Sequence, residues 1–262
     1  MENKFILSSL KVINLFAIIV LLLVTFSCAG TMQSSSRKEK AEALERLGNS
    51  LYLEGNPREG LAKLLEAEKL DPSNPDIQHE IAIVYQKIDQ FDLSLKYFKK
   101  AIDLKPDFPK AYNNMGILYF QMGDNENALK SFNKAVSYVL YQTPQYAYHN
   151  MGLVYYQLKE YQKAIEFYNK ALSESPEYLD AYYDLAMVYD ALGENEKAIL
   201  TYDKIIKQKP DSFSAYLEQA KVYQKTGQID KAVEKLNYII GTDPRSPIAR
   251  EAIKLLRDIQ SR

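Results

Sequence analysis

Residues 179–212 read LDAYYDLAMVYDALGENEKAILTYDKIIKQKPDS, and this stretch contains two amphipathic patterns at helical spacing. Each pattern places apolar and small residues on one helical face: Tyr182, Leu185, Ala186 and Tyr189 in the first, and Ala198, Ile199, Tyr202 and Ile205 in the second. Gly193 interrupts the chain between them, and Pro210 is expected to end the second helix because proline cannot continue one. The stretch therefore predicts two helices joined by a tight turn.

The pattern recurs at a period of 34 residues. Prolines that close successive units follow this period: Pro72 and Pro106, then Pro176, Pro210 and Pro244. Small residues in the first helix of each unit follow it too, except for a spacing of 36 between the third and fourth: Gly48, Ala82, Gly116, Gly152, Ala186 and Ala220. One hairpin cannot bury its own apolar stripe, so neighbouring hairpins must stack. We therefore predict an all-α solenoid of six hairpins, over residues 41–74, 75–108, 109–144, 145–178, 179–212 and 213–246, followed by a capping helix over 247–262.

Composition excludes several classes of function. The chain has 262 residues, of which 47% are hydrophobic, and a formal net charge of −1, so no global field favours nucleic acid or acidic lipid. A single cysteine excludes an intramolecular disulfide, and two histidines with one cysteine exclude a Cys/His metal cluster. We expect no cofactor, no metal and no small-molecule substrate.

The first 27 residues predict a targeting segment. Lys4 and Lys11 precede an apolar run over residues 12–26 (VINLFAIIVLLLVTF), and Cys28 follows it. A small residue before a cysteine at the end of such a run resembles the signal of bacterial lipoproteins, which implies cleavage before Cys28 and its lipidation. The alternative is an uncleaved anchor helix. In both cases we expect a protein of the bacterial envelope that is tethered to a membrane and whose body faces away from the cytoplasm, with residues 28–40 as a flexible linker.

The repeats resemble the tetratricopeptide repeat family, whose motif runs aromatic, Leu-Gly, Tyr, turn, Ala, aromatic, Ala, Pro. Repeat 4 carries it as Tyr148, Met151-Gly152, Tyr155, Ala164, Tyr168, Ala171 and Pro176. Repeat 1 departs from the motif most, with Gly60 where alanine is usual, and repeat 6 has Gln219 where leucine is usual. The resemblance implies a right-handed superhelical solenoid that binds proteins or peptides.

Repeat 3 contains the two extra residues, after Ala135. The segment carries four residues that we single out as a candidate interaction site: Tyr138, Tyr141, Pro144 and Tyr146. Either the second helix of repeat 3 is longer or a wider loop follows it, and the segment ends in a proline stop at Pro144. Together with the Cys28 signal and six repeats, the extension LYQTP resembles the type IV pilus biogenesis and stability lipoproteins, called pilotins. That resemblance implies a location at the outer membrane, facing the periplasm, and a role in assembling the secretin ring.

The first helix of each hairpin is expected to line a peptide-binding groove with the stripe opposite its core face. The predicted groove residues are Asn113, Asn114, Ile117, Phe120, Gln121, His149, Asn150, Leu153, Tyr156, Gln157, Tyr183 and Met187. Amides can hold a peptide backbone through both donor and acceptor, and aromatic side chains can anchor its side chains. The alternative is that these residues only seal packing between repeats. Asp180, Asp184 and Asp190 would give repeat 5 a preference for basic peptides.

Neither histidine supports catalysis. His149 has no serine, cysteine or carboxylate at a matched position and is expected to be a polar groove residue. His79 lies beside Glu80, and adjacent helix residues are expected not to face each other. We therefore predict a scaffold that is not an enzyme and whose partners are proteins, with a secretin or pilus component as one candidate. The alternative is an adaptor that recruits cell-wall hydrolases or proteases.

Overall fold

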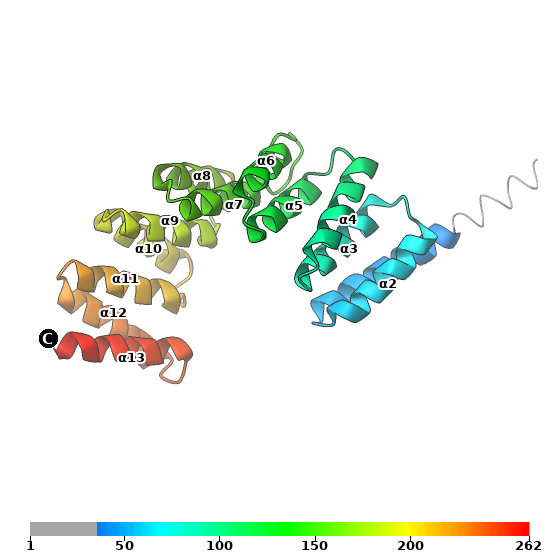
Figure 1. Cartoon of the computed structure of the whole chain (residues 1–262). Coiled ribbons are helices and arrows are strands. Elements are labelled where there is room, and N and C mark those ends of the chain that lie inside the picture. Colours follow the sequence, from blue (N-terminus) through cyan, green and yellow to red (C-terminus); the bar gives the residue numbers. More distant parts are fainter. Residues whose placement is uncertain (1–35, 262) are drawn as a thin grey trace, which may run out of the picture. The chain divides into compact units, whose positions relative to one another are not determined.

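The computed structural model describes residues 36–261, and within them the chain is helical and has no β-strand. Twelve helices, α2 to α13, follow a first helical stretch over residues 36–53 (Figure 1). The all-α repeat fold predicted from the sequence is confirmed. The targeting segment 1–27 and Cys28 lie outside the described residues. No helix within residues 36–261 combines the length and the apolar character needed to cross a membrane.

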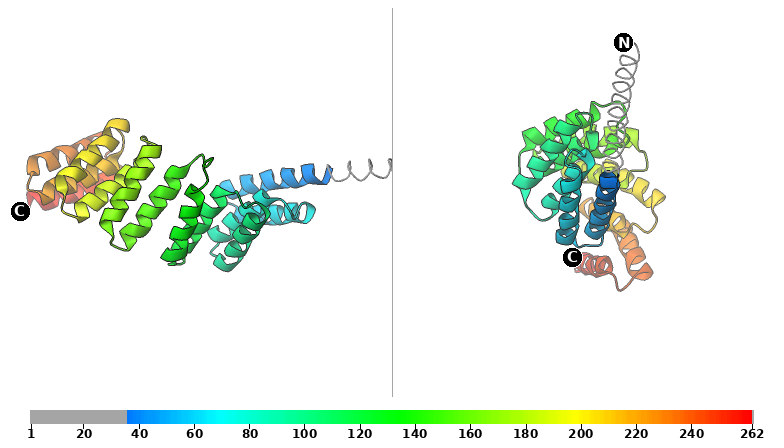
Figure 2. Two further views of the ribbon diagram at one scale, coloured as in Figure 1. Left: turned by 90° about the horizontal axis from the view of Figure 1, so that it is seen from above. Right: turned by 90° about the vertical axis from the view of Figure 1, so that its right-hand side faces the viewer.

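The chain divides after Pro106 into two compact units, each built from helical hairpins. In the first unit, the helix over residues 36–53 packs against α2, and α3 pairs with α4. In the second unit, α5 pairs with α6, α7 with α8, α9 with α10, and α11 with α12 (Figure 2). The helix bounds are α2 Pro57–Leu70, α3 Pro75–Lys87, α4 Phe91–Leu104, α5 Pro109–Gln121, α6 Asn125–Val136, α7 Pro144–Gln157, α8 Tyr161–Glu174, α9 Leu179–Ala191, α10 Asn195–Gln208, α11 Phe213–Lys225, α12 Ile229–Thr242 and α13 Pro247–Gln260.

The first helix extends further toward the N-terminus than the sequence indicated. The prediction that residues 36–40 belong to a flexible linker is wrong, because these residues are helical. Lysine, arginine and glutamate are good helix formers, and they make up most of this stretch (SRKEK). Ala41 follows it and is fully buried, in a cluster that includes Leu64 and Ala67 of α2, so packing holds the beginning of the helix in place.

Each hairpin reverses direction in a three-residue turn whose central residue has a left-handed backbone. Four of the six turns place glycine there, as at Gly193 with φ of 74°. Glycine pays no steric penalty in this region, which is why it is the usual residue there. The turns of repeats 2 and 4 instead hold Asp89 and Lys159, each with φ of 60°. These two positions store backbone strain.

Lys159→Gly is expected to stabilise the protein by up to about 1 kcal/mol. The left-handed region costs a non-glycine residue roughly 1–2 kcal/mol, part of which is offset by the greater freedom of glycine in the unfolded chain. Urea unfolding followed by circular dichroism measures the change. Gly193→Lys is the matched control, because it introduces the same strain one repeat away and should destabilise. If both substitutions changed the free energy of unfolding in the same direction and by the same amount, Lys159 would not be strained.

Small residues allow the two helices of a hairpin to approach closely. In repeat 1 a Cβ built on Gly60 would lie 2.6 Å from the carbonyl oxygen of Gly48, which is closer than real Cβ contacts come. This explains why glycine replaces the usual alanine at position 60. In repeats 3 and 4, Gly116 and Gly152 lie against the buried rings of Phe132 and Tyr168.

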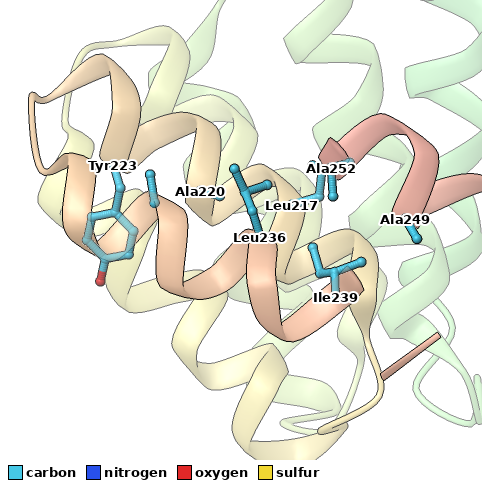
Figure 3. Close-up of a cluster of buried hydrophobic side chains, with 8 residues drawn as sticks. Leu217, Ala220, Tyr223, Leu236, Ile239, Ala249 and Ala252 are labelled. Carbon is cyan, nitrogen blue, oxygen red and sulfur yellow. The ribbon is translucent and has the colours of Figure 1, made fainter. Parts of the chain in front are cut away.

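The last helix closes the second unit. It packs on both α11 and α12 and buries Ala249 and Ala252 in a cluster with Leu217, Leu236 and Ile239 (Figure 3). Its other face is charged and exposed. One apolar face and one polar face are typical of a helix that caps a repeat array.

Candidate protein-binding surface

The predicted groove residues lie on the first helices of repeats 3, 4 and 5, which are α5, α7 and α9. These helices touch directly, α5 with α7 and α7 with α9. The structure brings the predicted residues onto neighbouring helices, but it divides them by burial. Gln121, Gln157 and Met187 are exposed, most of the others are half-buried, and Asn113 and His149 are buried, with 7% and 8% of their surfaces exposed.

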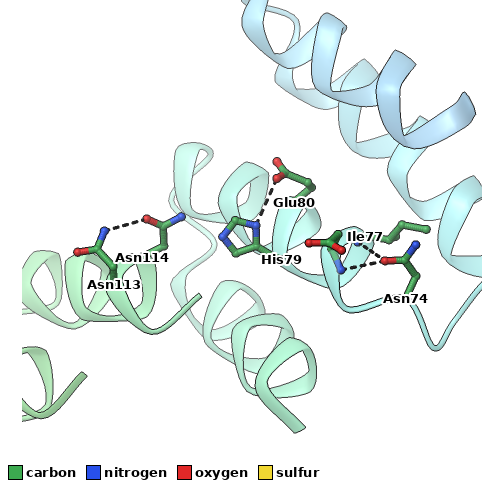
Figure 4. Close-up of polar contacts among 7 residues, drawn as sticks. Asn74, Ile77, His79, Glu80, Asn113 and Asn114 are labelled. Atoms are coloured by element: carbon green, nitrogen blue, oxygen red, sulfur yellow. Dashed lines mark hydrogen bonds and ion pairs between the residues drawn. The ribbon is translucent and has the colours of Figure 1, made fainter. Parts of the chain in front are cut away.

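The asparagines of repeats 3 and 4 bind one another. The Nδ2 of Asn150 donates to the Oδ1 of Asn113 over 3.2 Å. The Nδ2 of Asn113 donates to the Oδ1 of Asn114 over 3.3 Å (Figure 4). Both ends of the Asn113 amide are therefore used inside the protein. The prediction that Asn113 lines an open groove is wrong, and this residue joins α5 to α7. Asn150 remains half-buried and can still reach a ligand.

His149 connects repeats 4 and 5. Its Nε2 lies 2.7 Å from Oδ2 of Asp184 on α9, and its Nδ1 lies 3.2 Å from the hydroxyl of Tyr178. A carboxylate only accepts hydrogen bonds, so Nε2 carries the proton. Burial raises the pKa of Tyr178, so its hydroxyl stays protonated and shares a hydrogen bond with Nδ1. The expectation of an open polar groove residue is therefore wrong, because both ring nitrogens are engaged.

A double-mutant cycle on His149→Ala and Asp184→Ala is expected to show a coupling of about 1–2 kcal/mol in the free energy of unfolding. The side chains are only 10% and 24% exposed, so solvent competes weakly with their hydrogen bond. Chemical denaturation of the four proteins measures it. The exposed pair Lys170 and Glu166 is the control and should couple less strongly, because water screens it. A coupling no larger than that of the control would contradict the contact.

The acidic residues predicted to favour basic peptides are largely engaged. Asp184 holds His149, and Asp190 accepts from Nζ of Lys225 on α11 over 2.7 Å. Asp180 is exposed. Asp184 and Asp190 therefore connect successive first helices. Of the three carboxylates that were predicted to favour basic peptides, Asp180 is the one left for that role.

The apolar residues of the predicted groove are half-buried against the hydrophobic clusters. Ile117 and Phe120 pack on the core of repeat 3, Leu153 and Tyr156 on that of repeat 4, and Tyr183 on that of repeat 5. The ring of Tyr156 also lies 5.6 Å from that of Tyr161. Each side chain thus has one face in the core and one face toward solvent, which is compatible with both sealing and ligand contact.

The irregular segment of repeat 3 is a wider loop and not a longer helix. Helix α6 ends at Val136 and has 12 residues, where the other second helices have 14, and a loop over residues 137–143 follows. The sequence suggested that Pro144 stops the preceding helix, but α6 already ends at Val136. Pro144 is the first residue of α7, and its fixed φ suits that position.

The tyrosines of this segment have three different environments. Tyr141 is buried, with 8% of its surface exposed, in the core of repeat 3. Tyr138 stacks on Tyr112 at 5.9 Å between ring centroids, and Tyr146 meets Tyr178 edge-on at 5.4 Å. The tip of the loop, between Tyr138 and Tyr141, holds Val139 and Leu140, which are 97% and 86% exposed. Neither residue was predicted from the sequence as part of the candidate interaction site.

Two surface hollows lie away from the predicted groove. One of about 580 Å³ lies between the turns of repeats 5 and 6 and is lined by Gly193, Glu194, Asn195, Glu196, Lys197, Ile199, Thr226 and Gln228. A second, of about 390 Å³, lies at the equivalent place one repeat earlier. Both are open hollows between consecutive hairpin turns, so they follow from the repeat itself.

In the first unit, His79 contacts its neighbour. Its Nδ1 lies 3.2 Å from Oε1 of Glu80 (Figure 4), so the expectation that these adjacent residues do not meet is wrong. The side chain of glutamate is long enough to reach back along the helix surface. Within residues 36–261, no three His, Cys, Asp or Glu side chains gather in a way that could hold a metal ion.

Sequence models described as tetratricopeptide repeat, or TPR repeat, match residues 88–123, 107–173, 155–221 and 214–246. The chain is also 38% identical over 66 residues to a probable UDP-N-acetylglucosamine–peptide N-acetylglucosaminyltransferase, SPINDLY, of Oryza sativa subsp. japonica. That match covers 25% of this chain and 7% of the rice protein.

Three solved structures resemble the chain closely. PilF of Pseudomonas aeruginosa is 22% identical, with a TM-score of 0.70 over 82% of this chain and 97% of PilF. PilW, a widely conserved type IV pilus biogenesis factor, is 21% identical, with a TM-score of 0.73 over 81% of this chain and 98% of PilW. MamA is 30% identical, with a TM-score of 0.57 over 65% of this chain and 92% of MamA. The repeat matches and the similarity to MamA show that the chain belongs to the tetratricopeptide repeat family.

Proposed function

We propose that this chain is a membrane-anchored scaffold that assists assembly of a protein machine of the bacterial envelope, of the type IV pilus and secretin kind. The observation that carries the proposal is the match to PilW, which extends over 98% of that protein and 81% of this chain. PilW is a type IV pilus biogenesis factor. The Cys28 signal and the insertion in repeat 3 support the same reading from the sequence.

Tetratricopeptide solenoids present repeated helical surfaces to protein or peptide partners. In this chain the side chains that remain accessible on α5, α7 and α9 include half-buried aromatic residues such as Phe120 and Tyr156, together with Asn150 and the exposed Met187. Partly exposed aromatic and methionine side chains are typical anchors for a partner. This surface fits a peptide segment that inserts apolar side chains between neighbouring first helices.

The proposal includes a lipid on Cys28 and a position in the outer membrane facing the periplasm. It includes neither catalysis nor a cofactor. The match to the rice transferase covers too little of that protein to carry its activity over to this chain. His149 is engaged by Asp184 and Tyr178, so neither of its nitrogens is poised to act on a substrate.

Deletion of the gene tests this function. We expect loss of surface pili, seen by electron microscopy, and loss of secretin multimers, seen by immunoblotting of heat-treated envelopes. Complementation by the native gene should restore both, whereas a Cys28→Ala variant should not if lipidation anchors the protein. Altered cell-wall turnover with intact pili would contradict the proposal and favour the recruitment of cell-wall hydrolases.

A further inference from the structure

A tight turn in the loop of repeat 3 holds two aliphatic side chains in solvent. The backbone N–H of Tyr141 donates to the carbonyl of Tyr138 over 3.0 Å, which places Val139 and Leu140 at the two corner positions. Their exposed fractions, 97% and 86%, are the highest among the exposed large hydrophobic residues of the described chain. Gly, Pro, Asn and Asp dominate such corners, so valine and leucine are not there for turn formation.

The turn is fixed at both ends. Tyr138 stacks on Tyr112 of α5 at an interplanar angle of 28°, and Nζ of Lys134 lies 4.8 Å from the centroid of the Tyr138 ring. Tyr141 is buried in the same core cluster as Phe132. The two exposed side chains are therefore held by two anchored tyrosines, and a partner that binds them would lose little conformational freedom of this chain.

The turn lies in an uncharged stretch of sequence, and the ammonium group of Lys134 lies against the ring of Tyr138 at the start of the turn. Between Lys134 and Lys159 the sequence has no aspartate, glutamate, lysine or arginine, in a chain that is 26% charged. Tyr146 is 45% exposed and lies in this stretch, close to the loop in sequence. A membrane surface is usually recognised by aliphatic residues together with a cluster of basic residues, and Lys134 alone does not form one. An uncharged surface rich in tyrosine, with two aliphatic tips, matches instead the composition of the core of a protein interface.

We propose that the turn over residues 138–141 inserts Val139 and Leu140 into an uncharged, apolar pocket of a protein partner. The proposal rests on the function proposed above and adds a contact that the first-helix surface does not include. Burying two aliphatic side chains removes apolar area from water, which favours association. Because no charge takes part, the affinity should depend little on ionic strength.

The test places a photo-crosslinking amino acid at position 139 or 140 of the full-length chain in its native envelope. Position 200 is the control, because Leu200 is 63% exposed on α10 of the same unit. Positions 120 and 156 report on the first-helix surface. The protein crosslinked from 139 and 140 is then purified, and its affinity is compared for the native chain, Val139→Ser/Leu140→Ser and Leu200→Ser.

We expect one discrete protein adduct from 139 and 140 and none from 200. The double variant should bind that partner at least tenfold more weakly, or about 1.4 kcal/mol, while Leu200→Ser stays within about twofold. The affinity should be equal in about 0.1 M and about 1 M NaCl. Adducts with phospholipid, an equal loss in Leu200→Ser, or a salt-sensitive affinity would overturn the proposal. Adducts from 120 and 156 alone would refute the turn and leave the scaffold function standing, whereas no protein adduct from any position would refute both.

Discussion

Gly152→Leu is expected to lower the free energy of unfolding by about 3 kcal/mol, and Gly116→Leu should act similarly in repeat 3. A Cβ at position 152 would lie 2.4 Å from Cε1 and 2.6 Å from Cδ1 of Tyr168, whose ring is fully buried. The ring cannot move aside without displacing the core, and overpacking of this kind typically costs about 1–3 kcal/mol, occasionally more. Urea unfolding monitored by circular dichroism measures the loss.

Two further substitutions calibrate this result. Repeat 5 pairs Ala186 with Tyr202 at the equivalent positions, so Gly152→Ala should cost less than Gly152→Leu. Gly241 lies in α12, and a Cβ built there meets nothing within 4 Å. Gly241→Ala should therefore stabilise the protein, by up to about 1 kcal/mol, through better helix propensity. A Gly152→Leu protein that melts like the native chain would show that this glycine does not face the hairpin partner.

Tyr168→Ala and Tyr168→Phe are expected to change stability in opposite directions. Removing the whole ring leaves a cavity in a fully buried site and should cost roughly 3–5 kcal/mol. Removing only the hydroxyl should stabilise the fold by about 1 kcal/mol, because the hydroxyl is buried and has no hydrogen-bond partner among the described residues. The equivalent positions of repeats 2 and 3 hold Phe98 and Phe132, which shows that the site accepts phenylalanine.

The same denaturation measurements report both effects. Tyr202→Phe is a comparison one repeat later, where the tyrosine is also almost fully buried. A destabilising Tyr168→Phe would mean that the hydroxyl is satisfied, by a bound water for instance, and would contradict the stated reason for the gain. A small loss in Tyr168→Ala would contradict the placement of this ring at the centre of the hairpin.

The fold was predictable because turn residues and helix-ending prolines recur at a fixed spacing in the sequence. Gly193 and Pro210 mark the same turn and stop as their counterparts 34 residues away, and the structure has helices between these marks. The beginning of the first helix was not predictable in this way, since no turn residue separates residues 36–40 from Ala41. Only tertiary packing of Ala41 shows that the helix begins earlier.

The candidate surface was predictable in position but not in its contacts. Helical spacing placed Asn113 and His149 on first helices, but it did not indicate that the ring of His149 lies 5.6 Å from that of Tyr168 on the second helix α8. Whether such a residue is open depends on its neighbour in the next repeat, and Asn150 and Asp184 are 37 and 35 residues away. No periodicity within one repeat reports that distance in space. Exposure of Val139 and Leu140 was also hidden, although the uncharged stretch around them was a usable signal.

The proposed role in envelope assembly requires a partner protein to bind the surface formed by α5 and α7. Its most direct test is crosslinking in the native envelope, followed by affinity purification of the native chain and of Phe120→Ala/Tyr156→Ala, after circular dichroism has shown that the variant is folded. We expect that a secretin or pilus component purifies with the native chain and is lost from the variant. Recovery of cell-wall hydrolases, or of the same proteins with both chains, would contradict it.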